Sequence, residues 1–268
     1  MKEQTITKPN GTTHRLINSN FFDVEGLKAD LNIGDLPYNT TAGKFDKNVI
    51  PLKEMWGWLE GVVTTSIMFG SQPFTSKLIT SNLPQFKYEI VWEKPKGSNY
   101  VHAKYQPLKC HENIIVFSKQ GAAQGSKSPM RYTPQKTLGK PYDKGVGINT
   151  DIPILSGGSK DNSKIILKNE TGARCPRSVL YYSNQVKKGC KLNATQKPIE
   201  LLRYLIRTYT NVGDTVLDFT AGSMSLAVAC YLEGRNSICI EMDTEQYHKS
   251  VEWVRNCSEE DIYCVESC

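Results

Sequence analysis

Apolar and polar residues follow two different periods along most of this chain. Residues 62–69 are a short apolar run rich in β-branched side chains, the pattern of a buried strand in a parallel sheet. Residues 51–59 instead repeat apolar side chains every three or four positions behind Pro51, which is typical of a helix. Because helical and strand patterns alternate, the sequence predicts an α/β fold with a mostly parallel sheet and helices on both faces.

The same two patterns predict the other elements. Strands are expected at residues 15–18, 88–93, 113–117, 177–182, 214–219 and 237–241, and helices at 74–83, 199–206, 226–232 and 244–255. Residues 1–15 are polar and are expected to be loose, whereas residues 21–31 are expected to form an amphipathic helix or a turn. The clearest helix follows Pro198, and its apolar stripe consists of Ile199, Leu201, Leu202, Leu205 and Ile206.

The alternation stops in the middle of the chain. From about residue 119 to 175, Gly, Ser, Lys and Pro dominate, and only short apolar runs interrupt them. Residues 119–191 hold 14 Lys or Arg against four Asp or Glu, a net charge of +10, which leaves −4 for the rest of a chain whose total is +6. This asymmetry indicates a face that binds a polyanion, with a solvated lysine-rich loop region as the alternative.

The chain is therefore divided into residues 1–118, an inserted segment at 119–176, and residues 177–268. A chain of 268 residues, 39% of them hydrophobic, can bury the core of one large domain. No apolar run is long enough to cross a bilayer, and the first residues show no secretory signal. The eight Cys include no C-x-x-C pair, so we expect reduced thiols in a cytoplasmic protein and no metal site.

A first candidate site is the sequence Asp35, Leu36, Pro37 and Tyr38, which follows a short strand-like run. Pro37 disfavours helix at Leu36, so Asp35 should lie at a strand end with its carboxylate in a loop. The carboxylate and the Leu36 carbonyl can accept hydrogen bonds from an NH₂ group, and Tyr38 can stack on a flat ring. A corner of this kind suits a planar substrate with an exocyclic amine, although a plain strand and turn has the same pattern.

A second candidate site lies near the end of the chain. A strand ends at about Asp218, a turn of small residues around Gly222 leads into a helix, and the next strand ends in Glu241. In such a βαβ unit a ligand sits over the helix N-terminus, and the distal acid can hold two ribose hydroxyls. A single glycine does not make the G-x-G-x-x-G turn of dinucleotide sites, which favours S-adenosylmethionine as the ligand, with a plain βαβ unit as the alternative.

Taken together, these motifs resemble the amino-group DNA methyltransferases of the β arrangement, in which the catalytic motif precedes the cofactor motif. Asp35, Leu36, Pro37 and Tyr38 are similar to the D-P-P-Y of this family. The other similar segments are, in chain order, residues 70–74, residues 92–94, residues 195–202 (T-Q-K-P-x-x-L-L), residues 218–225 (D-P-F-x-G-S-G-T) and the acid Glu241. The order and spacing of the four main motifs carry the resemblance.

The resemblance implies a Rossmann-like, S-adenosylmethionine-dependent methyltransferase fold that acts on double-stranded DNA. It implies transfer of a methyl group to the N6 amine of adenine after the base leaves the duplex. Tyr38 would stack on that base, while Asp35 and the Leu36 carbonyl would hold its amine. The implied cofactor-binding residues are Thr195, Gln196, Lys197, Pro198, Asp218, Phe219, Thr220, Gly222, Ser223 and Glu241.

Four departures from the family pattern are visible. Leu36 replaces the first Pro, but only its backbone carbonyl is required. Phe219 and Thr220 replace Pro-Phe, and residues 18–20 stand where the family often has Gly-Asp. Met224 occupies the usual place of a second glycine, where its side chain would either crowd the methionine part of the cofactor or point away as an apolar wall.

The resemblance assigns reading of the DNA sequence to the variable segment, with Arg131, Tyr132, Arg174 and Arg177 as the candidate contacts. N4-cytosine methylation is the nearest alternative, although family enzymes of that type more often carry Ser in place of Asp35. A catalytically impaired DNA-binding protein and an RNA target stay open, as do a homodimer and a separate restriction nuclease. No restriction domain is visible, which favours a solitary or phage-type enzyme.

Overall fold

The computed structural model describes residues 1–38, 49–148, 164–183, 192 and 196–258. The chain divides into two compact units. The first consists of Met1–Thr133 together with Ser178–Cys268, and the second of Pro134–Arg177. Thr195, one of the expected cofactor residues, lies outside the described residues. No helix in the described part of the chain is both long and apolar enough to cross a membrane.

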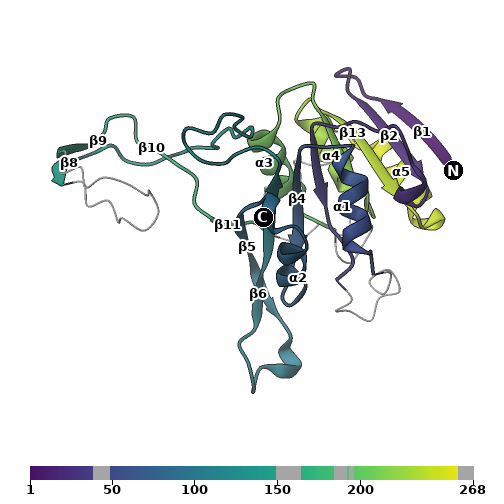
Figure 1. The fold of residues 1–268 in the computed structure, drawn as a ribbon, viewed down its shortest axis with the longest axis horizontal. Helices are drawn as coiled ribbons and strands as arrows, with labels where there is room; N and C mark the ends of the chain where they lie inside the picture. Colours follow the sequence, from purple (N-terminus) through teal and green to yellow (C-terminus); the bar gives the residue numbers. More distant parts are fainter. Residues whose placement is uncertain (39–48, 149–163, 184–191, 193–195, 259–268) are drawn as a thin grey trace. The chain divides into compact units, whose positions relative to one another are not determined.

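One nine-stranded sheet forms the centre of the first unit, in the order β1-β2-β13-β12-β3-β4-β6-β5-β11 (Figure 1). Its strands are Lys2–Thr7 (β1), Thr13–Asn18 (β2), Leu31–Gly34 (β3), Thr65–Gly70 (β4), Phe86–Ser98 (β5), Lys109–Ser118 (β6), Val179–Tyr181 (β11), Thr215–Asp218 (β12) and Asn236–Glu241 (β13). The five strands from β2 to β4 in this order are parallel, β6 is antiparallel to both of its neighbours, and β1 is antiparallel to β2. The predicted α/β class with a mostly parallel sheet is confirmed.

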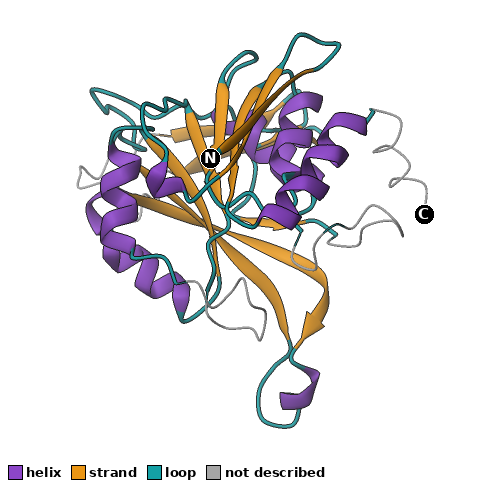
Figure 2. Cartoon of the chain, turned by 90° about the vertical axis from the view of Figure 1, so that its right-hand side faces the viewer, coloured by secondary structure: helices purple, strands orange, loops and turns teal. Residues whose placement is uncertain are grey.

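Helices cover both faces of this sheet (Figure 2). They are Leu52–Glu60 (α1), Phe74–Ser81 (α2), Ile199–Tyr209 (α3), Ser225–Leu232 (α4) and Thr244–Asn256 (α5), with short 3-10 turns at Phe21–Asp23 (η1), Leu83–Gln85 (η3) and Tyr100–His102 (η4). Alternate residues of β4 serve the two layers: Ile67 and Phe69 pack in the cluster that includes α3, whereas Met68 packs in the cluster that includes α1 and α2. A strand buried on both faces must be apolar throughout, which is why β4 has no polar alternation.

The strand directions bring several chain turns to one edge of the sheet. The parallel strands β3, β4, β12 and β13 all end at this edge, and the antiparallel β6 begins there. Asp35, Asp218 and Glu241 lie at the ends of β3, β12 and β13, and Glu112 lies near the start of β6. In open α/β sheets ligands bind at the carboxyl ends of the strands, so this edge is where a site is expected.

The expectation of a loose segment at residues 1–15 is wrong. Residues 2–7 form β1, which pairs along its full length with β2. Lys8 then donates to the carbonyls of Arg255 and Cys257, at 3.2 and 2.9 Å. An edge strand draws its order from one neighbour's backbone, and Ile6 is the one fully buried side chain of β1, so no apolar period marks it. Of the amphipathic helix or turn expected at residues 21–31, the structure shows a turn, η1, and Leu31 already begins β3.

The second unit contains two small antiparallel pairs. Thr137–Leu138 (β7) pairs with Ala173–Arg174 (β10), and Tyr142–Ile148 (β8) pairs with Lys164–Asn169 (β9). Residues 119–133, which the sequence placed in the insertion, belong to the first unit: Met130 is 7% exposed within its core, and the Thr133 N–H donates to the Thr208 carbonyl at 2.7 Å.

Candidate active site

Asp35 lies directly after β3, as the position of Pro37 led us to expect. The Tyr38 hydroxyl donates to Asp35 Oδ1 at 2.7 Å, which turns the carboxylate and the ring toward each other. Leu36 between them is buried in the core with 3% exposure. Its side chain therefore anchors the turn, and the substitution of Leu for the first Pro of the family pattern replaces one apolar anchor by another.

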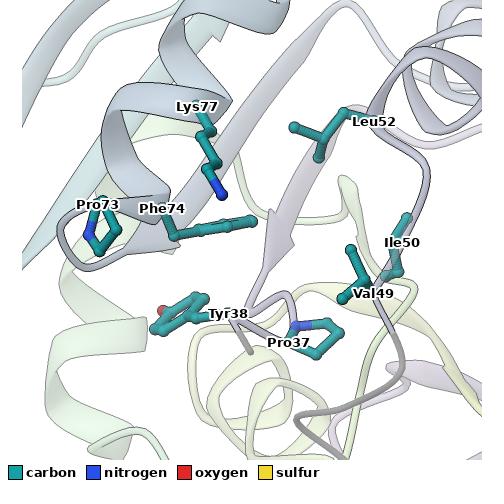
Figure 3. Close-up of a pocket in the computed structure, with 8 residues that line it drawn as sticks. All are labelled: Pro37, Tyr38, Val49, Ile50, Leu52, Pro73, Phe74 and Lys77. Atoms are coloured by element: carbon teal, nitrogen blue, oxygen red, sulfur yellow. The ribbon is translucent and has the colours of Figure 1, made fainter. Parts of the chain in front are cut away.

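Tyr38 packs against Phe74, the first residue of α2. The two ring centroids are 5.0 Å apart and the planes are inclined by 27°, an arrangement visible in Figure 3. The pair lines a cavity of about 190 Å³ whose other lining residues are Pro37, Val49, Ile50, Leu52, Pro73 and Lys77 (Figure 3). This cavity is mostly apolar and Asp35 does not line it. One side of the Asp35 corner is thus an aromatic wall.

The other side of Asp35 is occupied by a buried lysine. Lys197 is 8% exposed, donates to Asp35 Oδ2 and lies over the Phe69 ring at 4.9 Å from its centroid. Its ammonium is also 3.6 Å from Glu112 Oε2, and the second carboxylate oxygen of Glu112 accepts from Lys94. Acids and ammonium groups therefore alternate across the edge of the sheet, and each buried charge has an opposite charge beside it, as burial requires.

Electrostatics keep the middle of this row charged. Burial lowers the pKa of Lys197, but the carboxylates of Asp35 and Glu112 outweigh it, so the pKa is raised above its ordinary value. Burial raises the pKa of Glu112, but Lys197 and Lys94 outweigh it, so that pKa is lowered. Glu112 Oε2 is buried and accepts no hydrogen bond, which leaves it as a free acceptor beside the Lys197 ammonium.

The turn after β12 places a second pair of acids at the same edge. Asp218 Oδ1 accepts from the Thr220 N–H at 3.0 Å. Glu241 accepts from two backbone N–H groups, that of Gly222 at 2.8 Å and that of Asp243 at 2.7 Å, one on each carboxylate oxygen. Each carboxylate oxygen has a further lone pair, so Glu241 can still accept from two ribose hydroxyls. These acceptors therefore fit the ribose hydroxyls of S-adenosylmethionine.

Burial acts on the pKa values of both of these acids. Burial raises the pKa of Asp218 to about 7, and the nearby carboxylates of Asp35 and Glu241 add to the shift, against the hydrogen bond from Thr220. Burial also raises the pKa of Glu241, although its backbone hydrogen bonds oppose the shift. Both acids are thus held by backbone N–H groups and are partly desolvated.

The side chain of Met224 is directed into the hydrophobic core. Its φ of 57° lies in the left-handed region that favours glycine, which explains why the family pattern has glycine here. Its side chain is fully buried in the core cluster that contains Leu16, Tyr247 and Val251. Of the two alternatives for Met224, the structure shows the one in which the side chain leaves the turn, so Met224 does not fill the space above Gly222.

The remaining expected cofactor residues surround the same edge. Gln196, Phe219 and Ser223 are buried, and Gln196 Oε1 accepts from the Leu192 N–H at 3.1 Å. Pro198 precedes α3 directly. Asn18, which stands where the family often has Gly-Asp, donates to the Glu241 carbonyl at 2.9 Å and so supports the end of β13.

The four expected DNA contacts fall in two different units. Arg131 and Tyr132 belong to the first unit, where Tyr132 packs near Tyr209 with ring centroids 6.1 Å apart. Arg174 and Arg177 belong to the second unit. The Arg174 guanidinium donates to the carbonyls of Gly172 and Lys140, at 3.0 and 2.5 Å, and lies over the Tyr142 ring. Arg174 therefore stabilises its own unit, whereas Arg177 is exposed.

Sequence reasoning missed Glu112, and it noted Lys94 only as part of the similar segment at residues 92–94. The one local signal was an acid placed next to the apolar run of β6, opposite Trp92 in the sheet register. That signal does not reveal its partner, because Lys197 is distant in the sequence and approaches only through the fold. Among the described residues no group of three or more His, Cys, Asp or Glu could hold a metal ion.

Residues 29–252 match the family model N6_N4_Mtase, which describes a DNA methylase. The chain belongs to this DNA methylase family. The type II methyltransferase M1.MboII of Moraxella bovis is 26% identical over 260 residues, which are 88% of this chain and 94% of that protein. The family match covers the Asp35 corner, the Lys197 segment and the turn at Gly222 together.

Two solved structures share the fold. The crystal structure of the M1.HpyAVI–SAM complex has a TM-score of 0.60 at 20% identity and covers 91% of this chain and 100% of that one. The PvuII DNA methyltransferase, described as cytosine-N4-specific, has a TM-score of 0.55 at 15% identity and covers 98% and 95%. The expected amino-group DNA methyltransferase and its cofactor, S-adenosylmethionine, are confirmed, and the methylated amine is either N6 of adenine or N4 of cytosine.

Proposed function

We propose that this enzyme methylates the N6 amine of adenine in a specific sequence of double-stranded DNA. The observation that carries the proposal is the Asp35 corner itself. A carboxylate and an aromatic ring are joined by a 2.7 Å hydrogen bond at the end of β3, on the edge where the neighbouring β12 ends in Asp218. An exocyclic amine needs an acceptor and its base needs a stacking partner, and this corner supplies both.

In this proposal the protein acts mainly by positioning. Asp35 and the Leu36 carbonyl accept the two N–H bonds of the amine and so aim its nitrogen toward the pocket above Gly222. When bound there, S-adenosylmethionine supplies an electrophilic methyl group. The nitrogen loses a proton in the transfer, and the Asp35 carboxylate is the acceptor within reach. Holding the two reactants in line can lower the barrier by about 7 kcal/mol or more.

Lys197 limits the freedom of Asp35 in the absence of a base. It occupies Asp35 Oδ2, and the Tyr38 hydroxyl occupies Oδ1. An incoming amine must share these oxygens, and the free acceptor on Glu112 can take the Lys197 ammonium when it does. We assign Glu112 as a positioning residue for this exchange.

The choice of adenine rests on the carboxylate at position 35, because N4-cytosine enzymes of the family more often carry Ser there. DNA sequence recognition is assigned to the segment at 119–176, whose lysines would contact phosphates, together with the exposed Arg177 that follows it, which would reach base edges. The enzyme would act in the cytoplasm of a bacterial or phage-infected cell.

The test is to incubate the protein with DNA and labelled cofactor and to identify the labelled nucleoside by mass spectrometry. We expect label in N6-methyladenine. Label in N4-methylcytosine would overturn the assignment of the base, and label in RNA but not in DNA would overturn the substrate. Asp35→Ala, assayed beside the wild type, controls for methylation by a contaminating enzyme.

A further inference from the structure

The hairpin that joins β5 to β6 continues past the edge of the sheet at which Asp35 lies. Trp92 pairs with Glu112 at that edge, so residues 93–98 and 109–111 extend beyond it and the turn η4 lies at the tip. Both views show the hairpin projecting from the body of the first unit (Figures 1 and 2). Beyond Glu93, which still pairs with β11, no other strand of the described residues pairs with the hairpin, which makes this part an arm and not a part of the core.

The arm has a defined conformation. Asn99 adopts a left-handed φ of 66° at the end of β5, and two successive turns follow, with the His102 N–H bonded to the Asn99 carbonyl at 2.9 Å and the Tyr105 N–H to the His102 carbonyl at 2.8 Å. Gly97 permits a close approach, because a Cβ there would lie 2.7 Å from Leu108 Cβ. A preorganised arm loses little conformational entropy when it binds.

The surface of the arm combines positive charge with exposed apolar side chains. Residues 94–109 contain four Lys and no Asp or Glu, and Lys96 and Lys104 are exposed. At the tip, Tyr100 is 65% exposed, Val101 88% and Tyr105 87%. Large apolar side chains rarely cluster in water without a partner. A partner with negative charge along its edge and flat apolar faces inside it matches this surface, and duplex DNA has that chemistry.

The position of the arm links it to the site. Lys94, at its base, forms an ion pair with Glu112. Glu112 faces Lys197, which in turn contacts Asp35. The arm therefore emerges beside the corner that the target base must enter, so a duplex that delivers a base to Asp35 also passes the arm.

We propose that the β5–β6 hairpin is a DNA-binding arm, separate from the segment at 119–176. This inference rests on the proposed function, because it takes its partner from it. Lys96 and Lys104 contact backbone phosphates of the duplex beside the extruded nucleotide. Tyr100, Val101 and Tyr105 pack in the groove against sugars and bases, where apolar side chains can wedge between base steps.

The two parts of the arm can be tested separately. In Lys96→Gln with Lys104→Gln, the slope of log affinity against log salt for a mixed-sequence duplex should fall by about 2, because each phosphate contact contributes about 0.9. The matched control is Lys28→Gln with Lys87→Gln, which removes the same charge at the amino ends of β3 and β5, on the opposite edge of the sheet. The control should keep the wild-type slope.

In Tyr100→Ser with Tyr105→Ser, affinity should fall about tenfold at every salt concentration with an unchanged slope, since base contacts by aromatic side chains contribute without counterion release. Fluorescence anisotropy measures both variants. Thermal melting should be unchanged, because both side chains are exposed, and unchanged melting excludes misfolding as the cause.

Wild-type duplex affinity in both the lysine and the tyrosine double variants of the hairpin would overturn the proposal that it binds DNA. A changed oligomeric state by light scattering with unchanged duplex affinity would also overturn it, and would mark the tip as a contact between copies of the chain. Methyl transfer by the wild type separates the two proposals. If the wild type transfers methyl groups but the arm variants bind the duplex as the wild type does, the DNA-binding role of the arm alone is refuted. If the arm variants lose duplex affinity but the wild type transfers no methyl group, the proposed function is refuted and the DNA-binding role of the arm is kept.

Discussion

Two pairs of acids at one edge of the sheet are held in opposite ways. On the β3 side, Asp35 and Glu112 are neutralised by the ammonium groups of Lys197 and Lys94. On the β12 side, Asp218 and Glu241 accept from backbone N–H groups of the turns that follow their strands. The first pair is compensated by full charges and the second by dipoles.

The difference shows how one edge can serve two kinds of ligand. Backbone N–H groups stay where the turn fixes them, so Glu241 presents free lone pairs in a constant direction, which suits neutral hydroxyls. A lysine side chain can move, so Asp35 can exchange one hydrogen-bond donor for another when a base arrives. On the site assignment that we propose, the cofactor side is therefore rigid and the base side adaptable.

The strongest test of this contrast is Asp35→Ala. The variant removes the acceptor for the amine, so transfer should fall by about a thousandfold or more, which is the scale of losing a main positioning contact. Cofactor affinity, measured by calorimetry, should stay close to that of the wild type because Asp218 and Glu241 are untouched. Retained transfer in this variant would refute the assigned corner, and a parallel loss of cofactor affinity would refute the division into two sides.

The next test uses pH in the absence of ligands. The pKa of Asp218 is raised to about 7 in the folded protein, so the folded state favours the protonated acid. The contribution of Asp218 to the free energy of unfolding should therefore decrease by at most about 4 kcal/mol as pH rises from about 4 to 7. Above pH 7 this contribution should be constant.

Chemical denaturation of wild type and Asp218→Asn at several pH values measures this effect. The stability difference between the two proteins isolates Asp218 from other titrating groups, and the variant should gain on the wild type as pH rises. A stability difference that does not change with pH would show that Asp218 is not desolvated.

A smaller effect is expected for Glu241→Gln. The amide keeps one acceptor oxygen but loses the charge, so cofactor affinity should weaken about tenfold to a hundredfold, the value of a hydrogen bond to a charged group. Transfer at saturating cofactor should be nearly unchanged, since the Asp35 side is intact. Exposed Glu245 on α5 provides the matched control as Glu245→Gln. Equal affinities of the two variants would remove Glu241 from the site.

Met224→Gly should give the smallest change in cofactor affinity. Glycine relieves the cost of a left-handed residue, about 1–2 kcal/mol, but the variant loses a buried side chain worth about 2–5 kcal/mol. A net destabilisation of about 1–3 kcal/mol with unchanged cofactor affinity is expected from thermal melting and calorimetry. Tighter cofactor binding would mean that the Met224 side chain enters the pocket after all.

Much of the fold and the site followed from local patterns. Strand β3, the Asp35 corner and the Gly222 turn were each predictable because a handful of adjacent residues determine them. The edge strand β1 was missed because its order comes from pairing with β2 and not from its own apolar residues.

The ion pairs around Glu112 were not predictable for a related reason. Glu112, Lys94 and Lys197 come from three separate segments, and only the strand order brings them together. The same is true of the hairpin arm, whose sequence looks like an ordinary polar connection. Its proposed role depends on the edge of the sheet from which it projects, and the order and direction of the strands determine that edge.

The pairing of β3 with β12 has a consequence for the synthesis of this protein. Leu31 lies opposite Val216, so the two strands that carry Asp35 and Asp218 meet only after the long segment between them has been synthesised. Until then the nascent chain presents the unpaired backbone of β3, an edge that can capture other strands. Closing so long a loop also slows folding. Methylating activity should consequently appear late after translation, and chaperone supply should limit the yield of active enzyme.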